Sequence, residues 1–95
     1  MDALYNRAEA NVLLKRFQAA LADYEQVIQK GNSSFYKDAV KKAAIIAYND
    51  QQNFEKALRY YALYEDLSSG EEQFEAQINA LNSAFEIQDQ EAILK

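Results

Sequence analysis

The chain has 95 residues and a net charge of −5, and it contains no cysteine, no histidine, no proline and only two glycines. These absences exclude disulfides, the usual zinc ligands, Ser–His or Cys–His nucleophiles and glycine-rich phosphate loops, so we expect no enzyme activity, catalytic residue, metal or cofactor. The negative charge disfavours nucleic-acid binding, and no apolar run approaches the ~20 residues that span a bilayer, so membrane insertion is not expected.

The residue types and their spacing predict an all-α chain. Alanine, leucine, glutamate, glutamine and lysine are common, and all of them favour helices. Apolar residues recur at intervals of three and four, which keeps one side of a helix apolar. In chain order, we expect helices over about 3–14, 17–30, 35–50, 54–67 and 71–87, with a sixth beginning near Gln90. Asn53 lies directly before the fourth helix, where its side chain is suited to cap the first turn.

A four-residue pattern occurs twice, 37 residues apart. Its members are Phe17, Ala20, Leu21 and Tyr24 in the first copy and Phe54, Ala57, Leu58 and Tyr61 in the second. A period of this length is typical of stacked helical units. The small alanines allow two helices to approach closely and the aromatic side chains fill the space between neighbours, so both sets are expected in the core.

An aromatic residue, an Ala-Leu pair and a tyrosine at this spacing resemble the second helix of a tetratricopeptide repeat (TPR). Ile78, Leu81 and Phe85 match first-helix positions of a third, incomplete unit. The resemblance implies an all-α fold of antiparallel helix-turn-helix repeats stacked as a short right-handed superhelix. It also implies a single TPR-like domain over residues 1–95, with repeat one at about 2–34, repeat two at about 35–69 and a partial repeat three at about 70–95.

The chain departs from the family pattern at several positions. Arg7, Asn11 and Lys41 are polar where the family prefers apolar side chains. The step between units is 37 residues, longer than the ~34 of the standard repeat. TPR-like repeats of bacterial envelope proteins often have longer steps, so the chain resembles that branch more than it resembles chaperone cofactors. Cytoplasmic and periplasmic locations are both compatible with the sequence.

The resemblance implies a protein-protein interaction module, or scaffold, that binds a peptide or protein segment. In such repeats the first helices of successive units line a concave groove. The groove positions in this chain are Tyr5, Glu9, Val12, Lys42, Ile46, Asn49, Asn79 and Ser83. Ile46 directly follows Ile45, and adjacent residues on a helix point about 100° apart. Ile46 is therefore expected either to face the groove or to pack between repeats.

Two charge clusters leave alternatives open. Residues 60–95 carry eight acidic side chains and one basic side chain, which indicates either a solvated acidic end or a surface that selects a basic partner. Lys37, Lys41 and Lys42 form either a solvated basic face or an anchor for an acidic peptide. The alternative to peptide binding is structural self-association, in which the open ends of the stack pack on identical copies. The apolar Ala-Ile-Leu segment at 92–94 favours either that alternative or a chain that is part of a larger protein.

Overall fold

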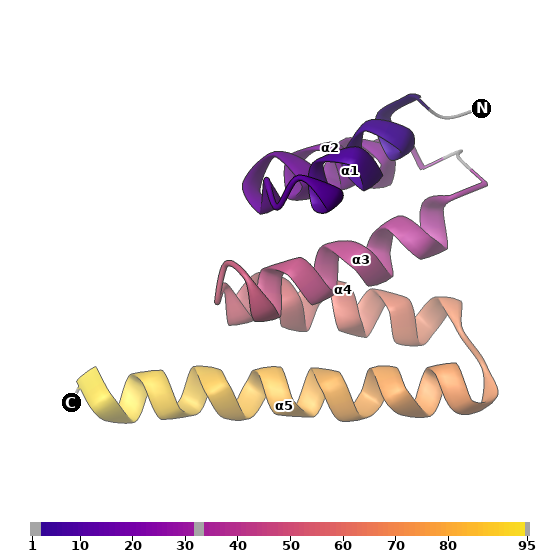
Figure 1. Cartoon of the computed structure of the whole chain (residues 1–95). Coiled ribbons are helices and arrows are strands. Elements are labelled where there is room, and N and C mark those ends of the chain that lie inside the picture. Colours follow the sequence, from indigo (N-terminus) through magenta and orange to yellow (C-terminus); the bar gives the residue numbers. More distant parts are fainter. Residues whose placement is uncertain (1–2, 32–33, 95) are drawn as a thin grey trace.

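The computed structural model describes residues 3–31 and 34–94. Within these residues the chain forms helices and no strand. The helices are α1 (Ala3–Leu13), α2 (Phe17–Lys30), α3 (Tyr36–Asn49), α4 (Phe54–Leu67) and α5 (Gly70–Leu94) (Figure 1). The prediction of an all-α chain is confirmed.

Most helix ends lie where the sequence places them. α2 and α4 begin and end at the predicted residues, and α1 and α3 differ by no more than one residue at either end. The side chain of Asn53 accepts a hydrogen bond from the backbone N–H of Lys56 at 3.1 Å, which confirms the expected cap. The predicted end near residue 87 and the sixth helix near Gln90 are wrong, because α5 continues to Leu94. No glycine or proline follows Gly70, so no backbone signal stops this helix.

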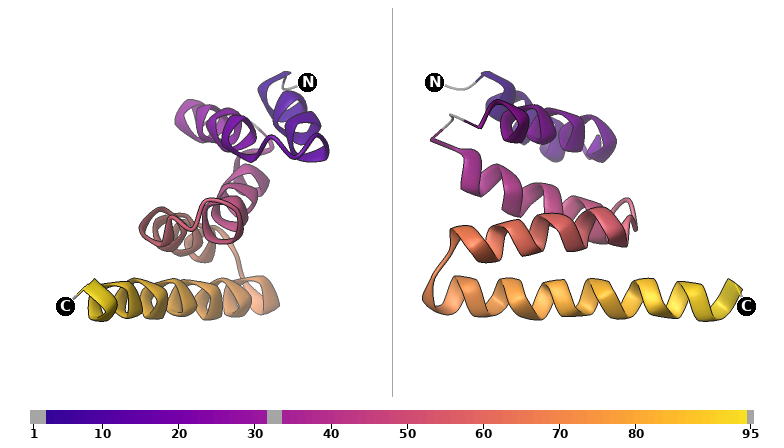
Figure 2. Two further views of the ribbon diagram at one scale, coloured as in Figure 1. Left: turned by 60° about the vertical axis from the view of Figure 1, so that its left-hand side comes forward. Right: turned by 180° about the vertical axis from the view of Figure 1, so that it is seen from behind.

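Consecutive helices run in alternating directions, and each packs chiefly on the next one along the chain (Figures 1 and 2). Ion pairs also join helices that are two apart in the chain. They are Lys42 with Glu9 at 2.6 Å, Lys56 with Glu25 at 3.2 Å and Lys37 with Glu72 at 3.4 Å. At 1.5 Å per residue, the 25 residues of α5 extend about 37 Å, against about 21 Å for α4. The end of α5 therefore projects past the other helices (Figure 1).

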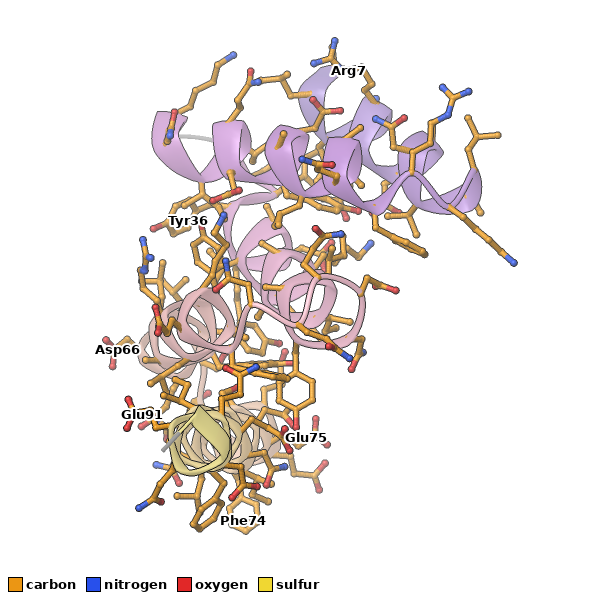
Figure 3. The ribbon with its side chains drawn as sticks, turned by 90° about the vertical axis from the view of Figure 1, so that its left-hand side faces the viewer. Arg7, Tyr36, Asp66, Phe74, Glu75 and Glu91 are labelled. Atoms are coloured by element: carbon orange, nitrogen blue, oxygen red, sulfur yellow. The ribbon has the colours of Figure 1, made fainter. Side chains whose placement is uncertain are left out.

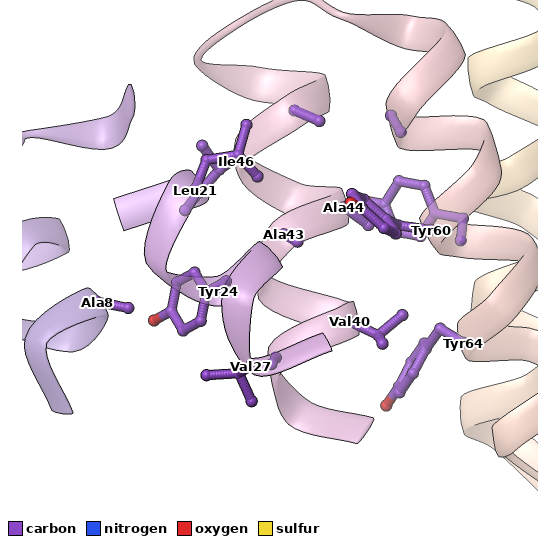
Figure 4. Packing of buried hydrophobic residues seen from close by; sticks show 14 of the residues in the cluster. Ala8, Leu21, Tyr24, Val27, Val40, Ala43, Ala44, Ile46, Tyr60 and Tyr64 are labelled. Carbon is purple, nitrogen blue, oxygen red and sulfur yellow. The ribbon is translucent and has the colours of Figure 1, made fainter. Parts of the chain in front are cut away.

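The core is built from alanines and aromatic residues at matching places of the two helix pairs. Ala20 and Ala57 are fully buried, and Tyr24 and Tyr61 are buried as well. α3 packs against both α2 and α4. Figure 4 shows the core continuing through it, from Tyr24 on α2 to Val40 on α3 and onward to α4. The core is therefore continuous through the helices rather than closed within one pair.

One buried carboxylate holds α1 to α2. The side chain of Asp23 on α2 is only 6% exposed, and it forms an ion pair with Arg7 of α1 at 2.7 Å. Arg7 donates a second hydrogen bond from Nε at 3.0 Å, and the amide of Asn11 donates a third at 3.0 Å. A buried charge requires such partners. The departures from the family pattern at Arg7 and Asn11 are therefore explained by Asp23, which lies on the neighbouring helix.

Candidate interaction surfaces

Lys42 occupies the centre of a polar network between α1 and α3. Its ammonium group lies 2.6 Å from Glu9, 3.1 Å from the hydroxyl of Tyr5 and 3.3 Å from Asp38. The Tyr5 hydroxyl donates to Asp38, and the Tyr24 hydroxyl donates to Glu9. The lysine is thus enclosed by acceptors from two helices, and its charge is matched within the chain.

Glu9 and Lys42 are stabilised in their ionised forms. Burial raises the pKa of Glu9, but hydrogen bonds from Lys42 and Tyr24 outweigh it, and the pKa lies below its ordinary value. Burial lowers the pKa of Lys42, but its hydrogen bonds to Glu9 and Tyr5 reverse that effect, and the pKa lies above its ordinary value. Lys42 therefore stays charged, and internal partners use its donor capacity.

Three residues expected to face the groove are buried. Tyr5 is 9% exposed, Ile46 is 4% exposed and Ser83 is fully buried. The Ser83 hydroxyl donates to the carbonyl oxygen of Asn79 within the same helix, at 2.9 Å. Ile46 packs in the core, and Ile45 beside it is half-buried. Both can find neighbours because α3 is covered on two sides.

The remaining predicted positions divide between a small pocket and places away from it. Glu9, Val12, Lys42 and Ile46 line a pocket of about 180 Å³ between α1 and α3. Asn49 is exposed at the end of α3, and Asn79 is half-buried on α5. Asn49, Asn79 and Ser83 do not line that pocket. The structure thus brings together half of the predicted positions, in a space smaller than a peptide groove.

The basic cluster of the sequence is divided between two sides of α3. Lys42 faces α1, as described above. Lys37 and Lys41 instead face α4, with their ammonium groups 5.8 and 5.9 Å from the ring centre of Tyr64. Both lysines line a pocket of about 280 Å³ that also contains Glu72. These contacts are internal, so the three lysines do not form one continuous basic face.

The largest uncovered apolar surface lies on α5. Its members, the α5 row, are Phe74 (60% exposed), Ile78 (44%), Leu81 (56%) and Phe85 (55%). Intervals of four, three and four residues place them on one stripe about 60° wide. The opposite side of α5 is buried at Ala76 and Ser83. Figure 3 shows Phe74 pointing away from the other helices.

The two edges of the α5 row differ in charge. Glu71, Glu75 and Asp89 are exposed along one edge, whereas Gln77 and Gln88 lie along the other. We call the first of these the acidic edge. Figure 3 places Glu75 on one side of α5 and Glu91 on the other. No lysine or arginine occurs between residues 70 and 91, so every charge beside the row is negative.

The apolar spacing of the α5 row can be read from the sequence, but the exposure of its side chains cannot. Ile78, Leu81 and Phe85 matched first-helix positions of a third unit, whose second helix was expected to begin near Gln90. In the structure α5 remains one continuous helix, so no second helix of that unit folds back on the row. The spacing predicts the apolar face correctly, but only the tertiary arrangement reveals that it is bare.

The described residues contain no group of three or more His, Cys, Asp or Glu side chains arranged to hold a metal ion. Within the same part of the chain, no helix combines the length and the apolar character needed to cross a membrane.

Comparisons with known proteins add no relative. No protein-family model, no curated protein and no solved structure matches the chain.

Proposed function

We propose that this chain is a protein-interaction module built from TPR-like repeats, and that the α5 row is its principal binding surface. The observation that carries the proposal is the exposure of Phe74, Ile78, Leu81 and Phe85 along a single stripe. Large apolar patches rimmed by polar residues mark interaction sites in soluble proteins. Aromatic side chains such as Phe74 and Phe85 also bring large contact area at an interface.

Two features support a repeat arrangement of antiparallel helix pairs stacked as a short right-handed superhelix. The repeated alanines, Ala20 and Ala57, have the same fully buried environment although they lie 37 residues apart. Ion pairs join α1 to α3, α2 to α4 and α3 to α5, which is the contact pattern of a stack. Within the described residues no helix covers the outer face of α5, and the α5 row is that face.

The pocket between α1 and α3 is a secondary candidate surface. It retains Glu9 and Val12, and Asn49 is exposed on the same helix as Lys42. However, Lys42 is paired internally and Ile46 is buried. A partner at this pocket would have to displace native contacts, whereas a partner at the α5 row would displace only water.

Site-specific photo-crosslinking tests the proposal. A photo-reactive amino acid would replace Phe85 on α5 or, as the control, Ala62, which is exposed on α4. We expect a discrete protein adduct from position 85 that is absent from position 62 and disappears when Leu81→Ser is added. Equal adducts from both positions, or adducts that survive Leu81→Ser, would show that the α5 row is not a binding surface.

A further inference from the structure

The exposed charged residues of the α1–α2 hairpin are all basic within the described residues, and the Glu9 side chain, which is 40% exposed, is paired with Lys42. Within residues 3–31, the exposed charged side chains are Arg7, Lys15, Arg16 and Lys30. All three acidic side chains of this segment are at least half-buried and engaged with partners. Glu9 pairs with Lys42, Asp23 with Arg7 and Asn11, and Glu25 with Lys56 and Tyr60. The outer surface of the hairpin is therefore positive, although its sequence contains both signs.

The same hairpin also carries uncovered apolar residues. Leu13 is 84% exposed and Leu14 is 61% exposed, directly before Lys15 and Arg16. Ala10 is exposed one turn earlier, so the outer face of α1 carries a small side chain at that point. An open depression of about 610 Å³ adjoins the turn, lined by Arg16 and neighbouring residues of α2. We call Leu13 to Arg16, with the outer face of α1, the head surface.

The head surface and the α5 row carry opposite charges, and both expose apolar side chains. The first is positive and exposes small side chains beside two leucines, whereas the second is negative and presents two phenylalanines, a leucine and an isoleucine. They lie on the first and last helices, on opposite sides of α3 and α4 (Figures 1 and 2). One molecule therefore leaves both of these surfaces free for contacts with other molecules.

We propose that a second copy of this chain occupies the α5 row, contacting it with its head surface. This inference rests on the proposed function, because it takes the α5 row to be the binding surface, and it names the occupant. Leu13 and Leu14 of one copy contact Leu81 and Phe85 of the next. Lys15 and Arg16 lie against the acidic edge and set the orientation, as rim charges generally do.

Charge selects this head-to-tail contact over pairing of two α5 helices. The acidic edge holds three exposed acidic side chains, and residues 70–91 contain no basic ones, so two α5 rows in contact would bring two acidic edges and six negative charges together. A head-to-tail contact joins two different surfaces and leaves one of each free at the ends. Such an association continues with further copies unless the geometry closes a ring. The average mass in solution therefore rises with concentration.

Sedimentation equilibrium with two variants tests the inference. The tail variant carries Leu81→Ser and Phe85→Ser, and the head variant carries Leu13→Ser and Leu14→Ser. All four positions are more than half exposed, so both variants keep the fold, which circular dichroism checks. The wild type should associate, and each variant alone should weaken association at least about tenfold. An equimolar mixture should form a dimer, because the intact tail of the head variant meets the intact head of the tail variant.

Each other outcome overturns the inference. A head variant that associates as the wild type does would show that contacts between two α5 rows are responsible. A mixture that stays monomeric would show that the two surfaces do not meet. A monomeric wild type that still crosslinks another protein through position 85 would reject the second copy and retain the proposed function. A monomeric wild type that crosslinks nothing would reject both.

A charge exchange provides an independent check. Lys15→Glu with Arg16→Glu should weaken association, and so should Glu71→Lys with Glu75→Lys in a separate chain. Mixing these two chains restores two contacts: the reversed head of one chain meets the reversed tail of the other, and the intact head of the second meets the intact tail of the first. Restored association that weakens with added salt is the expected result, because exposed charges are screened. Absence of restoration would show that these charges do not meet.

Discussion

The α1–α2 hairpin and α5 are both amphipathic, but they use their side chains in different ways. In the hairpin, Asp23 is enclosed by Arg7 and Asn11, and Glu9 by Lys42 and Tyr24. Among the described side chains of α5, Glu72 has contacts of this kind, with Tyr64 at 2.6 Å and Lys37 at 3.4 Å. Other acidic side chains of α5, such as Glu71 and Glu75, lie exposed beside bare apolar residues.

This difference between the hairpin and α5 comes from the elements packed against each region, not from the apolar spacing of the helices themselves. Each helix of the hairpin meets a partner helix and also α3, so its polar groups are drawn into contacts between elements. α5 packs mainly on α4 and extends beyond it. The same apolar periodicity therefore produces core in one region and an exposed apolar surface in the other. Amphipathic spacing describes one helix, whereas burial depends on what lies against it.

The largest expected effect separates a core aromatic residue from an exposed one. Tyr24 is fully buried, whereas Phe85 is 55% exposed. Tyr24→Ala should lower the free energy of unfolding by about 3–5 kcal/mol, because it leaves a cavity and removes the hydrogen bond to Glu9. Phe85→Ala should change it by no more than about 0.5 kcal/mol. Urea unfolding followed by circular dichroism measures both, and similar losses would contradict the assigned difference in burial.

A second comparison concerns two adjacent alanines. Ala20 is fully buried where α2 meets its neighbours, and Ala19 beside it is exposed. Ala20→Leu should destabilise by about 1–3 kcal/mol through overpacking, and Ala57→Leu should do the same. Ala19→Leu is the matched control and should be nearly neutral. If melting temperatures of all three variants remained at the wild-type value, the alanines would not mark close helix contacts.

The helix ends and the candidate site differ in how far the sequence could predict them. α2 and α4 were predicted to the residue, because apolar spacing and turn residues agree at both ends. The continuation of α5 through Gln90 was missed, because glutamine and aspartate there neither require nor prevent a turn. The burial of Ile46 depends on α2 and α4 covering two sides of α3, which spacing within α3 cannot encode.

Side-chain contacts between different helices could not be predicted from the sequence, for a related reason. Arg7 and Asn11 are polar at positions where apolar side chains were expected, and both donate hydrogen bonds to Asp23 on the other helix of the pair. Their pairing depends on how α1 rotates against α2. The charge of the hairpin surface has the same origin, because composition counts Glu9 and Glu25 as acidic residues, whereas the fold removes them from the outer face.

Removal of Arg7 should show how much its ion pair with Asp23 stabilises the hairpin. Arg7→Ala leaves the buried carboxylate of Asp23 with the amide of Asn11 as its remaining hydrogen-bond donor from α1. We expect a lower melting temperature than for Arg16→Ala, which removes an exposed charge outside this contact. Both variants lose one positive charge, so net charge cannot explain a difference. Equal melting temperatures would show that the buried ion pair does not hold α1 to α2.

Acid should weaken the contact between α1 and α3, with a smaller effect on stability than the Arg7→Ala substitution. The folded-state pKa of Glu9 lies below its ordinary value of 4.5, because hydrogen bonds from Lys42 and Tyr24 outweigh the opposing effect of burial. A carboxylate with a lowered pKa contributes stability above its unfolded pKa and loses it as pH falls through the folded pKa. Melting temperature should therefore fall below about pH 4.5. Glu9→Gln should flatten this fall, and Glu71→Gln, on the exposed edge of α5, serves as the control.

The central claim is that the two bare surfaces, on the hairpin and on α5, meet in solution. Backbone chemical shifts recorded during dilution of the wild-type chain test both surfaces at once. We predict concentration-dependent shifts at Leu13 to Arg16 and along Phe74 to Phe85, with unchanged shifts for buried residues of α3. Shifts confined to α5 would indicate pairing of two α5 rows, and shifts independent of concentration would contradict the association altogether.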